Sequence, residues 1–555
     1  MRVPFSCGLG LLPLLAVWLT YPLQAEPAGS AVLYTGAQFI TLDPAQPTAA
    51  AIFVDGGRIR AVHAKAPAEA PRGARLVDLK GGVVVPGLHD AHFHVGGLGE
   101  ALTNVDLTGT RSAAEVVERV KARLATHSKG AWLVGRGWDQ NDWACGKPPC
   151  GGQMPTRQLL DVVAPDTPVF LERIDGHAAW LNSAALGHAR DLGKDPEGGR
   201  ILRDAKGEPT GVLVDTAMDL VTLPRPEDKA LEDMVRLGAE RAAAAGLTAV
   251  HAMGVSNNEL AAMLALDRRG ELPLRIYAYL AGMEEGVLDH LPPGGIQRAE
   301  RRVEIRGVKL FADGALGSRG AALLAPYSDE KGHVGLLVTE PKVLEERSRA
   351  VHDRGFQVAI HAIGDRANRE VLEMFGRLGP QTAQRRHRVE HAQVVDPADW
   401  RAFKNLGVIA SMQPTHCTSD MPWAEARLGK ARLAGAYAWK SLLGAGAVLA
   451  FGSDAPVESE KPLWGLYAAR TRTDHTGKPK GGWQAQELLD GVTALKGFTQ
   501  GAAYAVGHED ELGTLKVGTL ADFTWLEADP TTAEPQKLLS MKVLGTAVGG
   551  VLRRN

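Results

Sequence analysis

The feature that most restricts the fold is a long alternation of apolar runs with helix-like stretches. Runs rich in Val, Ile and Leu recur at residues 83–85, 132–134, 169–171, 248–252, 274–280, 308–311, 357–360, 388–390, 408–412 and 448–451. Stretches with helical composition lie between some of them, at 113–126, 231–245, 341–354 and 367–378. This alternation predicts an α/β fold of parallel units, for which a closed (β/α)₈ TIM-like barrel is the commonest arrangement.

An open doubly wound sheet is the alternative to a barrel. Its dinucleotide-binding form requires a Gly-x-Gly-x-x-Gly turn between an early strand and a helix, and the sequence has no such turn there. The barrel is therefore the preferred interpretation, and a nucleotide cofactor is not expected.

The two ends of the chain differ from this middle part. Short β-rich pieces with turns such as Asp55-Gly56-Gly57 occur near the start, and similar pieces return at the C-terminus. We expect residues 26–84 and 506–555 to form one small β-sandwich domain, and residues 85–505 to form the barrel. A Gly-, Pro- and Asp-rich stretch at about 137–229 predicts an insertion that could supply a lid or a substrate pocket.

Residues 1–25 have the order of a secretory signal peptide. Arg2 is followed by a short apolar run and by Ala25 at the expected cut. The run is too short to predict a stable membrane span after cleavage, although an uncleaved anchor is the alternative. We therefore expect a periplasmic or secreted protein, in which Cys145 and Cys150 could close a small disulfide ring or remain two reduced thiols.

The charge balance argues against two classes of partner. The chain has 62 Lys and Arg against 64 Asp and Glu, so no net field attracts nucleic acid or an anionic membrane surface. We expect a small-molecule substrate and no nucleic acid, and the sequence is compatible with a homo-oligomer.

A cluster of polar residues follows the first apolar run of the middle part. Residues two apart on an extended chain point to the same side, so Asp90, His92 and His94 would line one face. Barrel enzymes keep their sites at the carboxyl ends of the strands, and two imidazoles that project together suit a divalent metal. The sequence therefore predicts a metal site here, with exposed loop histidines as the alternative.

Three further apolar runs end in residues that can bind a metal. The first ends in His361, the second in Glu390-His391, and the third in Gly452-Ser453-Asp454. One such histidine would more often be structural than a ligand. Three in order, after an initial His-x-His, are much stronger evidence.

Together these residues resemble the amidohydrolase superfamily, in particular the amidohydrolase-3 branch that includes N-substituted formamide deformylases. The resemblance covers nearly the whole chain after residue 25. It is carried by Val85-Pro86-Gly87-Leu88-His89-Asp90-Ala91-His92-Phe93-His94, Asp175-Gly176-His177-Ala178-Ala179-Trp180-Leu181-Asn182-Ser183, Val308-Lys309-Leu310-Phe311-Ala312-Asp313-Gly314, His361-Ala362-Ile363-Gly364-Asp365-Arg366-Ala367, Glu390-His391, Gly452-Ser453-Asp454 and Gly513-Thr514-Leu515-Lys516-Val517-Gly518-Thr519-Leu520-Ala521-Asp522.

The resemblance implies a set of metal ligands. They are His92 and His94 on the first barrel strand, His361 and His391 on the fifth and sixth, and Asp454 after the eighth. Lys309 stands where binuclear members carry a carboxylated lysine that bridges two metals, and a plain ion pair with Asp313 is the alternative. We expect divalent metal, two Zn²⁺ ions in the bridged case, with Fe or Mn able to use the same ligands.

The resemblance also implies a mechanism. The metal activates water, Asp454 takes its proton and passes it to the departing nitrogen, and the metal or His177 polarises the carbonyl oxygen. A plain structural contact in the inserted region is the alternative for His177. Deaminases of this fold place a Glu three residues after the fifth-strand histidine, where this chain has Gly364. Hydrolysis of a non-peptide C–N bond is therefore favoured. A lactone or ester hydrolase, or a metal-binding barrel with a regulatory or binding role, is the alternative.

Overall fold

Eight parallel strands curl into a nearly closed barrel at the centre of the computed structural model, which describes residues 31–127, 130–143, 153–296 and 301–555. In chain order they are β8 (Leu88–Phe93), β15 (Leu247–Val255), β16 (Arg275–Ala281), β17 (Val303–Phe311), β18 (Gln357–Ala362), β19 (Arg388–His391), β20 (Ile409–Met412) and β21 (Val448–Phe451). Each strand pairs with the next, and a bridge between Phe93 and Ala455 joins the last to the first. The predicted barrel fold is confirmed.

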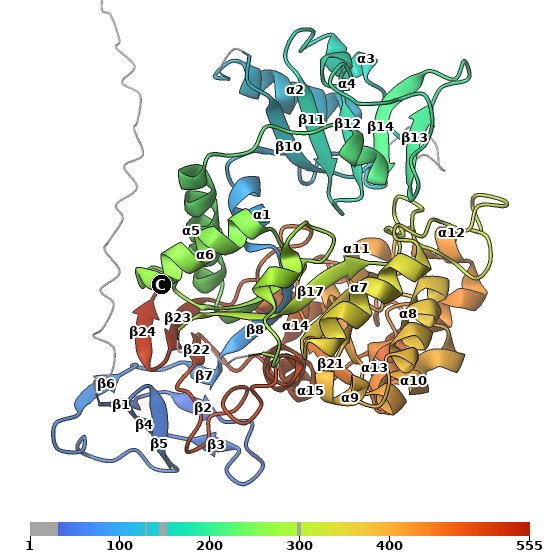
Figure 1. Ribbon diagram of the computed structural model, residues 1–555. Coiled ribbons are helices and arrows are strands. Elements are labelled where there is room, and N and C mark those ends of the chain that lie inside the picture. Colours follow the sequence, from blue (N-terminus) through green and yellow to red (C-terminus); the bar gives the residue numbers. More distant parts are fainter. Residues whose placement is uncertain (1–30, 128–129, 144–152, 297–300) are drawn as a thin grey trace, which may run out of the picture.

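Helices lie between the strands of the barrel and after its last strand, and many of them cover its outer face (Figure 1). They include α1 (Val95–Ala101), α5 (Asp228–Ala244), α6 (Asn257–Arg268), α7 (Pro341–Asp353), α8 (Asp365–Arg377), α9 (Thr382–Arg385), α10 (Trp400–Leu406), α11 (Pro414–Asp420), α12 (Ala424–Leu428), α13 (Trp439–Gly444), α14 (Pro462–Thr471), α15 (Gly491–Lys496), α16 (Ala502–Ala505) and α17 (Pro535–Leu538). Their ends follow local chemistry. The Ser256 side chain, for example, accepts a hydrogen bond from the Glu259 amide and so caps the start of α6.

A second sheet is inserted between the first two strands of the barrel. Its order is β13-β14-β12-β11-β10-β9, and it lies above the barrel in Figure 1. The strands are β9 (Val105–Asp106), β10 (Leu133–Trp138), β11 (Val169–Arg173), β12 (Ala178–Leu181), β13 (Gly199–Arg203) and β14 (Pro209–Asp215), accompanied by α2 (Ala113–Leu124), α3 (Gln158–Asp161) and α4 (Ser183–Leu186). The apolar runs at 132–134 and 169–171 therefore belong to this sheet and not to the barrel.

The two ends of the chain meet in a pair of packed sheets. One has the order β5-β4-β1-β6 and the other β24-β23-β22-β7-β2-β3. The strands are β1 (Val32–Thr35), β2 (Gln38–Ile40), β3 (Thr48–Ala49), β4 (Ala51–Asp55), β5 (Arg58–His63), β6 (Arg75–Asp78), β7 (Val83–Pro86), β22 (Phe523–Leu526), β23 (Val543–Val548) and β24 (Val551–Arg554). Tyr34 and Phe523 pack edge to face in their shared core, with ring centroids 5.2 Å apart. The expected sheet domain from both termini is confirmed.

Gly87 marks the passage from the terminal sheet to the barrel. The run at 83–85 lies in β7, which pairs with β2 and β22, and the first barrel strand begins only at Leu88. A side chain at Gly87 would collide with Thr248 of the next barrel strand. The chain therefore changes sheets within one residue, and His92 lies inside a barrel strand.

Some sequence predictions lie outside the described residues. These are the signal peptide at residues 1–25 and the Cys145–Cys150 pair. Within the described ranges, Cys417 is buried and forms no disulfide. No helix in the part of the chain that the structure describes is long and apolar enough to cross a membrane.

Candidate metal centre

Two histidines at the carboxyl end of β8 meet at the mouth of the barrel: His92 lies within the strand, and His94 directly follows it. β8 is buried along its whole length, and its alternation brings His92 and His94 together, with ring centroids 5.5 Å apart. This is the carboxyl end of the strands, where barrel enzymes hold their active sites.

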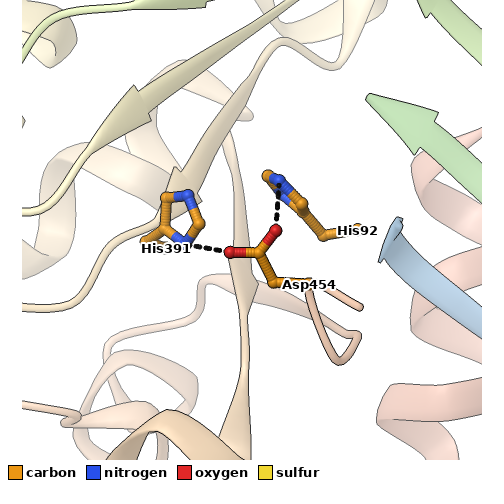
Figure 2. A group of neighbouring side chains, drawn as sticks. All are labelled: His92, His391 and Asp454. Carbon is orange, nitrogen blue, oxygen red and sulfur yellow. Dashed lines mark ion pairs between the residues drawn. The ribbon is translucent and has the colours of Figure 1, made fainter. Parts of the chain in front are cut away.

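Asp454 follows β21, the strand that closes the barrel beside β8, and His391 ends β19. Figure 2 shows the side chains of His92, His391 and Asp454 converging. Asp454 Oδ1 lies 3.0 Å from His94 Nε2 and 3.4 Å from His92 Nε2, and Oδ2 lies 4.0 Å from His391 Nδ1. Among the described residues, His92, His391 and Asp454 form the group whose three ligand atoms lie within 4.8 Å of one another. All three are buried, which is the arrangement expected of a metal centre.

The ring nitrogens that do not face Asp454 are already bound. His92 Nδ1 donates to Glu390 Oε2 at 2.6 Å, and His94 Nδ1 donates to the Met253 carbonyl at 3.0 Å. In the neutral rings, each Nε2 therefore directs a lone pair at the Asp454 carboxylate, which also accepts and cannot donate. A divalent cation satisfies all of these groups, so the residues fit a metal.

The charge states of the side chains agree with this fit. Burial holds the pKa of His92, His361 and His391 well below its usual value, which keeps the imidazoles neutral. Burial raises the pKa of Asp454, but its interactions with His94, His416 and Lys309 together outweigh burial and hold this pKa below the usual range. At neutral pH the site therefore presents neutral imidazoles and one carboxylate.

Lys309 and His361 complete the ring of candidate ligands. Lys309 Nζ on β17 lies 3.2 Å from His92 Nε2, and burial lowers the pKa of this amine to about 8. His361 ends its run on β18, with its ring centroid 4.5 Å from that of His391. The six residues that the sequence indicated as ligands thus surround one site.

His177 reaches the same site from the inserted sheet. Its ring centroid is 4.9 Å from that of His361, and its Nδ1 lies 2.7 Å from Asp215 Oδ1. Burial lowers the pKa of His177, but the hydrogen bond and charge of Asp215, together with the charges of Asp175 and Asp313, outweigh burial and raise this pKa. His177 therefore lies at the wall of the metal centre, held by a carboxylate.

The sequence alone did not single out the residues that hold the ligands in place. Glu390 binds His92 and is itself bound by Arg388 at 2.7 and 3.0 Å. Asp90, expected beside the ligands, accepts from the amides of His92 and Ser453 and so ties β8 to the segment that carries Asp454. In the sequence, the position of Glu390 directly before the candidate ligand His391 was the signal that could have indicated its supporting role.

Glu390 and His391 can both face the interior because the backbone departs from the strand conformation. His391 has a φ of 72°, and Asp454 has a φ of 62°. Both values lie in the left-handed region, which is costly for residues other than glycine and is concentrated at functional sites. Strand alternation alone would have placed Glu390 and His391 on opposite faces.

The centre opens into a cavity of about 1030 Å³. Barrel residues such as Phe311, Trp423 and Trp464 line part of it, and the inserted sheet supplies another wall that includes Arg136 and His177. A cavity of this size accommodates a small organic substrate. The insertion therefore belongs to the candidate active site.

Comparisons with known proteins agree with this architecture. The chain is 33% identical over 488 residues to the putative amidohydrolase YtcJ of Bacillus subtilis, covering 85% of this chain and 89% of that protein. It is 28% identical to the N-substituted formamide deformylase of Arthrobacter pascens, covering 92% and 96% of the two chains. An uncharacterized metal-dependent hydrolase from Pyrococcus horikoshii has a similar structure, with a TM-score of 0.74, 29% identity and coverage of 91% and 99%. The sequence profile of the amidohydrolase family matches residues 75–553, and this chain belongs to that family.

Proposed function

We propose that this protein is a metal-dependent hydrolase of a carbon–nitrogen bond other than a peptide bond, of the amide, N-formyl or N-acyl type. The observation that carries the proposal is the convergence of His92, His391 and Asp454 at a cavity large enough for a small molecule. The bond type is supported by the similarity to the N-substituted formamide deformylase.

The residues that would hold the metal are His92, His94, Lys309, His361, His391 and Asp454. When bound, the metal supplies a Lewis acid that activates water near neutral pH and polarises a carbonyl oxygen. We propose two Zn²⁺ ions bridged by a carboxylated Lys309, with Fe or Mn as alternatives for the same ligands.

The bridge is supported by the place of Lys309. Lys309 is 2% exposed and lines the cavity, and its amine lies 3.2 Å from His92 Nε2. When the neutral amine attacks carbon dioxide, a nitrogen–carbon bond forms and one proton leaves the nitrogen. The product is an anion with two oxygens, which suits two cations better than an ammonium group does.

Asp454 and His177 would carry out the proton and charge chemistry. Asp454 would accept the proton of the attacking water and give it to the departing nitrogen. Its Oδ1 lies 3.0 Å from His94 Nε2, and the residue lines the cavity. His177 would donate to the carbonyl oxygen as negative charge develops there.

The loop after β18 argues against a deaminase. Gly364 stands where deaminases of this fold carry a Glu, and a side chain there would collide with the backbone of Ala322. The Gly364 amide also donates to Asp313 Oδ2 at 2.8 Å. The loop therefore has no room for a glutamate at this position, which leaves hydrolysis of an amide-type bond as the favoured reaction.

The test is a purified protein of measured metal content, assayed on N-formyl amines, N-acyl amines, lactones and dipeptides. We expect turnover of an N-formyl or N-acyl substrate and its loss in Asp454→Asn. Intact mass after exposure to ¹³CO₂ would report the carbamate on Lys309. Turnover of lactones alone would favour an ester hydrolase, and no turnover by fully loaded protein would favour a binding role.

We further propose export to the periplasm or the medium, action on a small molecule without nucleic acid, and a possible assembly into homo-oligomers. Export is supported by the sequence of residues 1–25. N-terminal sequencing of exported protein should begin after Ala25, and sedimentation would give the oligomeric state. A mature protein that starts at Met1 would contradict cleavage.

A further inference from the structure

The inserted sheet carries a histidine–aspartate pair at its edge above the barrel. His177 directly precedes β12, Asp215 ends β14, and the two strands pair with Ala178 opposite Val214. The Asp215 amide donates to the His177 carbonyl at 3.0 Å, and the His177 ring donates from Nδ1 to Asp215 Oδ1 at 2.7 Å. Main chain and side chain thus hold the two residues in one geometry.

Asp215 is kept in a conformation that costs free energy. Its φ is 51° and its ψ is −128°, a combination that residues with a side chain rarely adopt. Its second carboxylate oxygen, Oδ2, is buried and has no hydrogen-bond partner among the described residues. Neither feature improves stability, since an unsatisfied buried acceptor is destabilising.

The barrel makes room for this carboxylate. Gly314 and Gly320 belong to the segment that follows β17, the strand that carries Lys309. A Cβ atom on either glycine would come within 2.5 Å of Asp215 Oδ2. Side chains at these two positions would therefore displace Asp215, and the barrel and the insertion are matched at this contact.

The ring of His177 is turned toward the cavity. It lines the cavity beside His361, and its Nε2 has no hydrogen-bond partner in the part of the chain that the structure describes. Because the Asp215 carboxylate can only accept, it requires the hydrogen of the ring to be on Nδ1. Nε2 is then the nitrogen available to a substrate.

We propose that Asp215 is a positioning residue that sets the ring orientation and tautomer of His177, so that the inserted sheet contributes a substrate-facing group to the active site. This inference rests on the proposed hydrolase function. It assigns to the insertion a direct part in the reaction in addition to its place as a wall of the cavity.

The test is a double-mutant cycle on the metal-loaded enzyme, using Asp215→Asn, His177→Gln and the double variant. We expect Asp215→Asn to lower kcat more than about tenfold with KM and metal content little changed, since a misplaced hydrogen-bonding group costs turnover. In the His177→Gln background the same change should cost nothing further. An equal loss in both backgrounds, or no loss in either, would overturn the inference.

A matched control is Asp161→Asn. Asp161 also lies in the inserted region and accepts from the Ser183 amide and hydroxyl, away from the cavity. Its replacement should leave kcat unchanged. A loss of kcat equal to that of Asp215→Asn would mean that any weakening of the inserted region has this effect.

A second measurement is independent of turnover and of the folding of variants. In metal-free wild-type protein labelled with ¹⁵N-histidine, the His177 signals are those absent from His177→Gln. We expect a hydrogen on Nδ1, and a neutral ring with its hydrogen on Nε2 would overturn the inference. If the wild-type enzyme turns over no substrate, the proposed function fails, while this spectrum still decides the role of Asp215.

Discussion

The barrel interior holds buried histidines at both ends, in two different settings. At the carboxyl end, His92 and His94 each direct Nε2 at the Asp454 carboxylate beside an open cavity, and Lys309 Nζ also lies 3.2 Å from His92 Nε2. In the amino-terminal half, His89 and His251 lie with ring centroids 6.0 Å apart, and the ring of Tyr277 packs against both. Both ring nitrogens of His89 are buried, and neither has a hydrogen-bond partner within the described ranges.

The two ends differ in whether the histidine nitrogens point at one common carboxylate, and not in the number of histidines. At the carboxyl end, Glu390 and the Met253 carbonyl fix one nitrogen of each ring, so that the other points to Asp454. In the amino-terminal half, Arg388 donates to His251 Nδ1, which leaves Nε2 of that ring as a buried donor. A metal-ligating histidine typically donates from one ring nitrogen to a carboxylate or carbonyl, which leaves the other nitrogen to face the metal. His92 and His94 have this arrangement, and among the described residues His89 does not.

The largest effect should come from Asp454. Asp454→Asn removes the proposed proton acceptor and is expected to lower kcat/KM by roughly 10³-fold. Steady-state kinetics with parallel metal analysis would measure this. The matched change in the amino-terminal half is Glu304→Gln. The Glu304 carboxylate pairs with His508. This change should leave kcat/KM nearly unchanged, and equal losses in the two variants would remove the functional distinction between the two ends.

Metal should stabilise the protein through the carboxyl end alone. At a free concentration 100 times the Kd, Zn²⁺ is expected to raise the free energy of unfolding by about 2.7 kcal/mol. Denaturant titration with and without chelator would measure the gain. His391→Ala should abolish most of it, whereas His89→Leu should retain it. If the stabilisation by Zn²⁺ were lost in His89→Leu, the metal would bind in the amino-terminal half of the barrel, which would contradict the assigned site.

Glu390 should matter through His92. Glu390→Gln weakens the acceptor that orients the ring and is expected to lower metal affinity by about 10- to 100-fold. Competition with a chromophoric chelator would give the Kd. Asp267→Asn is a suitable control, because the Asp267 carboxylate lies in α6 and accepts from the amides of Arg302 and Val303 at the start of β17. Unchanged affinity in Glu390→Gln would contradict the role assigned to the hydrogen bond.

The smallest effect should be the acid sensitivity caused by His89. Burial lowers the pKa of His89 from 6.5 to about 4. Below pH 6.5 the unfolded chain therefore binds a proton that the folded protein does not, so stability falls as the pH drops from 6.5 toward 4. At pH 5.5 the loss is roughly 1 kcal/mol relative to pH 8.

His89→Leu should remove this loss. Denaturant titrations of chelated protein at pH 8 and pH 5.5 would compare the variant with the wild type. The difference between the two pH values separates ionisation from packing, because the packing change is present at both. The same pH dependence in both proteins would show that His89 is ionised in the fold or does not contribute.

Much of the barrel could be predicted from local patterns. The helix expected at 341–354 is observed as α7, Pro341–Asp353, and the one expected at 113–126 as α2, Ala113–Leu124. The runs at 132–134 and 169–171 are also strands, but in the inserted sheet. Periodicity reports that a strand is buried, and it cannot report which sheet contains the strand.

The sequence by itself determined the ordered series of candidate ligands from His92 to Asp454, and Gly364 in place of a glutamate. These are features of residue type and spacing, which exist before the chain folds. Only the tertiary structure decided that Glu390 holds His92, that Asp215 holds His177, and that the ring nitrogens of His89 have no hydrogen-bond partner among the described residues. The reason is that each of these facts depends on contacts between distant segments and on backbone angles, such as the φ of 72° at His391, that strand alternation does not predict.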